Sequence, residues 1–206
     1  MTLDPFWHTV VDGHFDPELL RAVVAEVPAV DDPRWHHYDN AREGKLEGGP
    51  AMWGTATREL AGLLDSAEFA AQLADLSGID GLSCEFEGGG YHLIPPGGRL
   101  AVHADFNRSP STYRFRRLNV LVYLNEGWTV ADGGLLELWD DAGPAVEILP
   151  VFNRMVVFKT SSTSFHGHPV PLPGPRLRLS FAAYFFTEDP ADEYAGVDHS
   201  TVFHAS

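Results

Sequence analysis

The chain has 206 residues, with 29 acidic against 14 basic ones, a net charge of −15 and a pI near 4.9. This balance excludes nucleic acid and anionic membrane as expected partners, because both are themselves negatively charged. Hydrophobic residues make up 44% of the chain, enough for a large core, and the length predicts one domain overall.

Cysteine usage and hydropathy predict the compartment. The single cysteine, Cys84, permits no internal disulfide and indicates a reducing compartment. No apolar leader follows Met1, and no run of about 18 apolar residues occurs. We therefore expect a cytoplasmic protein. The single compact domain without an evident peptide-binding module favours a small-molecule substrate, and the sequence leaves the oligomeric state open.

Helical patterns are confined to the first 80 residues. Asp16 is a suitable N-cap, Pro17 suits the first helical position, and Ser66 is a second suitable cap. The intervening stretch 29–52 is polar and irregular, and it predicts a loop that is either solvated or substrate-facing. The predicted helices cover residues 16–26, 55–64 and 67–77.

From residue 82 the pattern changes to short strand-like runs separated by Gly, Pro, Asn and Asp. Eight strands at this spacing are typical of a jelly roll. We expect a helical N-terminal part at 1–81 that packs on a β core at 82–187, and a tail or lid at 188–206. The predicted strands lie near 83–94, 99–105, 116–125, 134–140, 145–149, 154–160, 163–169 and 176–186.

The chain contains three His-x-Asp triplets. On a strand, residues two apart point to the same face, so such a triplet can supply two of the three ligands of a facial triad for non-haem Fe(II). The first triplet is better explained by helix capping, and the second lies in the irregular stretch. The third stands in the apolar run LAVHADFN. The triplets are His14-Phe15-Asp16, His37-Tyr38-Asp39 and His103-Ala104-Asp105.

A triad needs a third ligand, and TSSTSFHGHPV offers His166 and His168. The remaining metal positions would take a bidentate 2-oxo acid and O₂. The distal carboxylate of such an acid needs a buried cation, for which arginine is well suited. In PRLRLSFAAYFF, three polar residues alternate onto one strand face: Arg176, Arg178 and Ser180.

Residues 82–187 resemble the prolyl 4-hydroxylase-like Fe(II)/2-oxoglutarate-dependent dioxygenases. Six pieces follow one another in the family's order: GGGYHLIPPGGRLAVHADFN, RRLNVLVYLNEGW, DGGLLELWD, ILPVFNRMVVFKTS, SFHGHPVPLP and RLRLSFAAYFF. The resemblance implies a double-stranded β-helix, the cupin-like jelly roll, with iron bound by His103, Asp105 and His166. It also implies 2-oxoglutarate held by Arg178 and Tyr123, a further co-substrate contact near His92, and ascorbate as a stimulant. Strand alternation adds the hydroxyl of Ser180 beside Arg178.

The implied activity is hydroxylation of an unactivated C–H bond, with release of succinate and CO₂. We favour a small amino-acid-like or natural-product substrate, with a prolyl or other side chain of a protein or peptide as the alternative. A cupin-like isomerase, a metabolite-binding protein and a catalytically silent relative stay open as other classes. The segment RSPSTYRFRRLN predicts either an anion-attracting cluster or a solvated loop; its arginines are Arg108, Arg114, Arg116 and Arg117.

Overall fold

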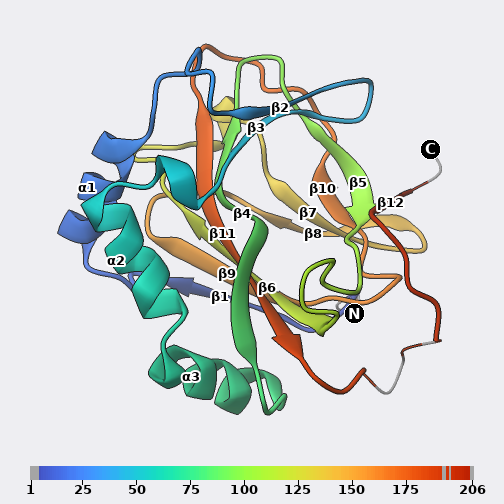
Figure 1. The fold of residues 1–206 in the computed structure, drawn as a ribbon. Coiled ribbons are helices and arrows are strands. Elements are labelled where there is room, and N and C mark those ends of the chain that lie inside the picture. Colours follow the sequence, from blue (N-terminus) through green and yellow to red (C-terminus); the bar gives the residue numbers. More distant parts are fainter. Residues whose placement is uncertain (1–4, 192–193, 195, 205–206) are drawn as a thin grey trace.

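Two antiparallel sheets enclose a cavity in the computed structural model, which describes residues 5–191, 194 and 196–204 (Figure 1). The larger sheet has seven strands in the order β1-β9-β6-β11-β4-β3-β2, and the smaller has five in the order β12-β5-β10-β7-β8. The expected mainly β fold with few helices is confirmed.

The elements follow the predicted order closely. The helices are α1 (Pro17–Glu26), α2 (Thr55–Leu64) and α3 (Ala67–Ser77), with short 3₁₀ turns at Pro50–Met52 and Val130–Asp132. The strands are β1 (His8–Asp12), β2 (His36–Asp39), β3 (Gly44–Gly48), β4 (Ser83–Ile94), β5 (Leu100–Ala104), β6 (Phe115–Tyr123), β7 (Leu136–Asp140), β8 (Gly143–Ile148), β9 (Arg154–Lys159), β10 (His166–His168), β11 (Arg178–Thr187) and β12 (Val202–Phe203).

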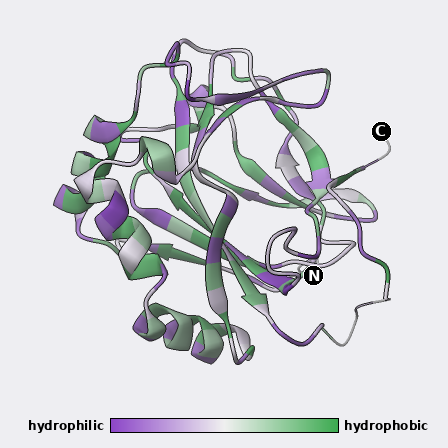
Figure 2. Ribbon diagram, viewed as in Figure 1, coloured by the Kyte–Doolittle hydropathy of each residue, from purple (hydrophilic) through white to green (hydrophobic). Residues whose placement is uncertain are grey.

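The three helices lie on one side of the larger sheet (Figure 1). The Asp16 side chain accepts a hydrogen bond from the backbone N–H of Glu18 at 2.9 Å. The Ser66 side chain accepts one from the backbone N–H of Phe69 at 3.1 Å, as the capping pattern predicts. In Figure 2 each helix carries both hydrophilic and hydrophobic residues, as expected where one face is buried. None of the described helices is long and apolar enough to cross a bilayer.

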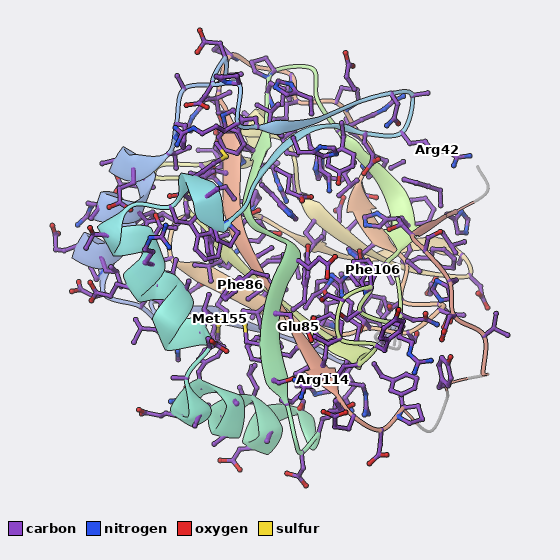
Figure 3. All side chains as sticks on the ribbon, viewed as in Figure 1. Arg42, Glu85, Phe86, Phe106, Arg114 and Met155 are labelled. Carbon is purple, nitrogen blue, oxygen red and sulfur yellow. The ribbon has the colours of Figure 1, made fainter. Side chains whose placement is uncertain are left out.

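Strand β11 is buried along its whole length, because it is covered on both faces. Leu179, Phe181 and Phe185 belong to the core shared with the helices. Burying one such side chain contributes about 1.5–3 kcal/mol. Figure 3 shows Phe86 and Met155 toward the helices, while Phe106 lies on the opposite side. Strand alternation therefore turns the intervening residues of β11 toward the smaller sheet and the cavity.

The prediction of an irregular stretch at 29–52 is wrong in part. Strand β2 pairs with β3, and β3 pairs with β4 with Leu46 opposite Leu93, so this stretch forms the edge of the larger sheet. Edge strands are held by backbone hydrogen bonds and often carry charged side chains, so apolar alternation is weak there. Strands β1 and β12 were not predicted either, and β12 has only two residues.

Glu26, the last residue of α1, holds the N-terminus of α2. Its carboxylate accepts the backbone N–H of Ala56 at 2.9 Å and of Thr57 at 2.8 Å, and the Thr57 hydroxyl at 2.7 Å. Burial by itself would raise the pKa of Glu26, but these hydrogen bonds lower it. A lowered folded-state pKa means that the stabilisation is present above the unfolded-state pKa and is lost as pH falls through the folded-state value.

We expect Glu26→Ala to lower the free energy of unfolding by about 1.5–3 kcal/mol at neutral pH, the scale of hydrogen bonds to a charged group. Denaturant titrations at pH 7 and below pH 4 should show this difference shrinking in acid. Glu59→Ala is the control, because Glu59 is exposed on α2. A loss that is equal at both pH values would contradict the role of the carboxylate.

Candidate active site

Three side chains with metal-binding atoms meet at β5 and β10. His103 lies on β5, Asp105 directly follows that strand, and His166 on β10 pairs with His103 in register. The Nε2 atoms of both histidines lie 3.5 Å from the Asp105 carboxylate, and the three ligand atoms lie within 4.8 Å of one another. We call these residues the His–Asp–His cluster; His168 is not part of it.

Backbone carbonyls orient both imidazoles. Nδ1 of His103 lies 2.8 Å from the carbonyl oxygen of Ala101, and Nδ1 of His166 lies 3.0 Å from that of Ser164. A carbonyl oxygen only accepts, so each Nδ1 carries the proton and each Nε2 keeps its lone pair. Burial, and then the neighbouring imidazole of His103, lower the pKa of His166 to about 4. The donor set therefore fits Fe(II), which binds neutral imidazole and carboxylate on one face.

Asp105 is held in place by two partners on β6. Asn119 donates to its Oδ2 at 2.7 Å, and the Arg116 guanidinium lies 3.1 Å from the same oxygen. Oδ1 is directed to His103, and Oδ2 also lies 3.5 Å from Nε2 of His166. Burial alone would raise the pKa of Asp105, but Arg116 and the two imidazoles lower it well below its usual value. The carboxylate is thus ionised and oriented, as a metal ligand requires.

The position of Arg116 differs from the sequence interpretation, which placed it in a basic loop. Its side chain is 1% exposed, donates to the Asn119 side-chain oxygen, and lies over the rings of Phe106 and Tyr184 at 4.5 and 3.5 Å. The register of β6 against β11 shifts at Arg117, which brings residues 116 and 119 to one face although they are three apart. Regular alternation cannot predict this pairing.

The opposite end of the cavity carries the residues expected to hold the co-substrate. Ser180 on β11 stands between Tyr123 of β6 and His92 of β4 in the sheet register. Arg178 Nη2 lies 3.3 Å from the Tyr123 hydroxyl, and its Nε donates to the Gly134 carbonyl at 2.7 Å. Burial raises the pKa of Tyr123, and burial together with Lys45 lowers the pKa of His92 to about 3.

Arg178 is a buried cation, 4% exposed, that forms no ion pair with any described carboxylate. Burying an unpaired charge is costly, so such a site is suited to an anionic ligand. Gly134 permits this arrangement: its φ is +64°, and a Cβ there would lie 2.7 Å from the Arg178 side chain. The arrangement fits the distal carboxylate of 2-oxoglutarate.

The other candidates lie away from this cavity. His37 and Asp39 are exposed on the edge strand β2, and Asp16 caps α1, so neither of the first two triplets forms a site. Arg176 precedes β11, donates to the carbonyls of Glu126 and Gly127 and pairs with Asp132. The remaining basic residues of the 108–117 segment bond elsewhere: Arg108 to Asp198, Arg114 to Glu188 and Arg117 to Thr187.

One cavity joins the two ends of the site. Its lining includes Lys45 of β3, which the sequence did not single out because it lies in the stretch read as irregular. Its other lining residues are His92, Ile94, Leu100, His103, Asp105, Asn119, Leu121, Leu136, His166, Gly167, His168, Arg178, Ser180 and Tyr184.

Residues 89–186 match the family model of the 2OG-Fe(II) oxygenase superfamily. This segment contains the whole His–Asp–His cluster and Arg178, and the resemblance seen in the sequence is confirmed. Members of the family use Fe(II) and 2-oxoglutarate.

The chain is also similar to individual proteins and solved structures. Over 93 residues the chain is 34% identical to prolyl 3-hydroxylase OGFOD1 of Xenopus laevis, a match that spans 42% of this chain and only 18% of that protein. A Pseudomonas putida prolyl-4-hydroxylase superposes with a TM-score of 0.64 at 24% identity, covering 88% of this chain and 93% of its own. HygX of Streptomyces hygroscopicus, with nickel and 2-oxoglutarate bound, superposes at 0.60 and 16% identity, covering 96% and 94%.

Proposed function

We propose that the chain is an Fe(II)- and 2-oxoglutarate-dependent oxygenase that hydroxylates an unactivated C–H bond of a small amino-acid-like or natural-product substrate. One observation carries this proposal: the His–Asp–His cluster and the unpaired, buried Arg178 share one cavity. A cupin-like isomerase or metabolite-binding protein would need the metal ligands but not a buried arginine beside them. A catalytically silent relative would need neither the metal ligands nor the buried arginine.

In this proposal His103, Asp105 and His166 hold the iron. Arg178 and Tyr123 bind the distal carboxylate of 2-oxoglutarate, and Ser180 and His92 line the same end of the cavity. When bound, iron and 2-oxoglutarate together supply the oxidising chemistry from O₂, with succinate and CO₂ as the other products. Asn119 and Arg116 keep Asp105 ionised and in place. The two sheets form a double-stranded β-helix in this proposal, and the segments 1–81, 82–187 and 188–206 belong to one domain.

The covered edge of β5 supports a small substrate. The backbone N–H of Ala101 donates to the Arg42 carbonyl at 2.7 Å, and Val202 and Phe203 of β12 pair with Ala104 and His103 farther along the same strand. The Arg42 guanidinium also lies over the Phe203 ring at 4.8 Å. Segments from both ends of the chain thus bound the strand that carries His103, which favours a compact substrate over an extended peptide.

A second candidate is a hydroxylase of prolyl or other side chains in a protein or peptide. The 34% identity to a segment of a prolyl 3-hydroxylase favours it. The same iron and 2-oxoglutarate residues would serve both reactions, so the two candidates differ only in what enters the cavity.

We expect the apo protein, titrated with Fe(II) and 2-oxoglutarate without oxygen, to develop the visible charge-transfer band of the chelate, and His103→Ala to lose it. On admission of air with ascorbate, wild type should convert 2-oxoglutarate to succinate slowly without substrate. Free amino acids, small natural products and prolyl peptides can then be compared for accelerated turnover and a gain of one oxygen. Fe(II) binding without a band would contradict the proposed function, and acceleration by peptides alone would select the second candidate.

A further inference from the structure

His168 is a buried histidine for which the proposed chemistry has no role. It lies on β10 two residues after His166, and both side chains line the cavity although the register against β5 shifts between them. Gly167 between them packs against β5, because a Cβ there would lie 2.8 Å from the Leu100 carbonyl oxygen. His168 is 3% exposed and lines the cavity together with Arg178.

Both ring nitrogens of His168 are buried without a hydrogen-bond partner among the described residues. Buried polar groups are nearly always paired, because an unpaired one loses its bonds to water and gains nothing in return. The other buried, unpartnered side-chain atoms within the described part of the chain are Nη1 of Arg116 and Oγ1 of Thr160. His168 is thus distinguished by having both nitrogens unpartnered, and it faces a cavity in which a ligand can satisfy them.

The surroundings of His168 select the charge of that ligand. Arg178 and Lys45, two basic side chains, line the same cavity as His168. The carboxylate of Asp105, which also lines it, is already engaged by Arg116 and Asn119. The imidazole offers an N–H donor, and in a cavity with two basic side chains the complementary acceptor is an anion.

The distance along β10 indicates which part of the ligand contacts His168. Two residues of a strand span about 6.6 Å, so His168 lies roughly that far beyond His166 and the His–Asp–His cluster. This separation is comparable to the length of a five-carbon dicarboxylate whose 2-oxo acid end is at the metal. Its far end would then reach His168 and Arg178 together.

We propose that His168 binds the distal carboxylate of 2-oxoglutarate as a hydrogen-bond donor beside Arg178, and so helps to select a dicarboxylic co-substrate. The inference rests on the proposed function. It adds a donor from the smaller sheet to those that Arg178 and Tyr123 supply from the larger one, so that the carboxylate would bridge the two sheets.

Anaerobic titration of the Fe(II) protein with two 2-oxo acids tests this inference. His168→Leu should raise the dissociation constant for 2-oxoglutarate by about 10- to 150-fold, the effect of one hydrogen bond to a charged group. Binding of 2-oxobutyrate, which has the same 2-oxo acid end but no distal carboxylate, should stay within about twofold. His168→Asn and His168→Gln place an amide nitrogen near Nδ1 or Nε2, and at least one should recover most of the affinity.

Several outcomes would overturn the inference. An unchanged constant for 2-oxoglutarate, an equal loss for both acids, or no recovery by either amide would each do so. The unliganded His168→Leu protein should unfold at the same or a higher temperature than wild type, because it no longer buries unpaired nitrogens; a lower temperature would mean that His168 is bonded within the protein. His37→Leu on the exposed strand β2 is the matched control. Failure of wild type to bind 2-oxoglutarate would instead overturn the proposed function itself.

Discussion

Asp105→Ala should abolish iron-dependent release of succinate, because it removes the carboxylate from the His–Asp–His cluster. The change should also lower the free energy of unfolding by about 3–5 kcal/mol, since it leaves Arg116, 1% exposed, without its counterion. Succinate formation from 2-oxoglutarate and a denaturant titration measure the two effects separately.

Asp105→Asn separates loss of the ligand from loss of the fold. Its amide oxygen can still accept from Asn119 and Arg116, so it should be more stable than the alanine variant while turnover is still strongly reduced. The matched control is Asp39→Ala, which disrupts an exposed His-x-Asp triplet on β2 and should leave turnover unchanged. Wild-type turnover in a folded Asp105 variant would refute the assignment of the cluster.

Arg178→Ala should weaken binding of 2-oxoglutarate by about 1.5–3 kcal/mol or more, which corresponds to roughly 10- to 150-fold in the dissociation constant. The reason is that the variant loses the buried cation that forms no ion pair with the described carboxylates. Anaerobic titration followed by the charge-transfer band gives the constant, and Fe(II) affinity without 2-oxoglutarate should be nearly unchanged.

Arg176→Ala is the control for this measurement. Arg176 lies two residues away in the sequence, but its guanidinium is bound to Asp132 and to backbone carbonyls outside the cavity. Its replacement should leave the dissociation constant unchanged. If Arg178→Ala binds 2-oxoglutarate as tightly as wild type, the distal carboxylate is held elsewhere.

Much of the fold could be predicted from local signals. The starts of α1 and α3 followed from Asp16, Pro17 and Ser66, whose side chains or ring act within one turn. Strand β4 matches its predicted range because Gly and Pro mark both of its ends. The strands at 36–39 and 44–48 could not be predicted, because an edge strand needs only backbone partners, and its pairing with β4 is not local.

The site residues, too, could be predicted where local alternation places them, but not where long-range strand pairing does. Alternation placed His103 with Asp105 and Arg178 with Ser180, and both pairs face the cavity. The choice between His166 and His168 depends on which residue stands opposite His103 across the sheet, and a single sequence does not contain that register. The contact of Arg116 and Asn119 with Asp105 depends on an irregularity of β6. The position of Lys45 in the cavity depends on β3, a strand that the pattern did not predict.

The neighbours of β5 have a consequence for folding kinetics. The strand that carries His103 acquires its partners from residues 42–44, from β10 and from β12, all far away in the sequence. Each pairing must overcome loop-closure entropy before its contacts contribute, whereas α2 and α3 form from local contacts. We therefore expect the His–Asp–His cluster to assemble late, so that capture of a divalent cation would report that the last long-range pairings of the chain have formed.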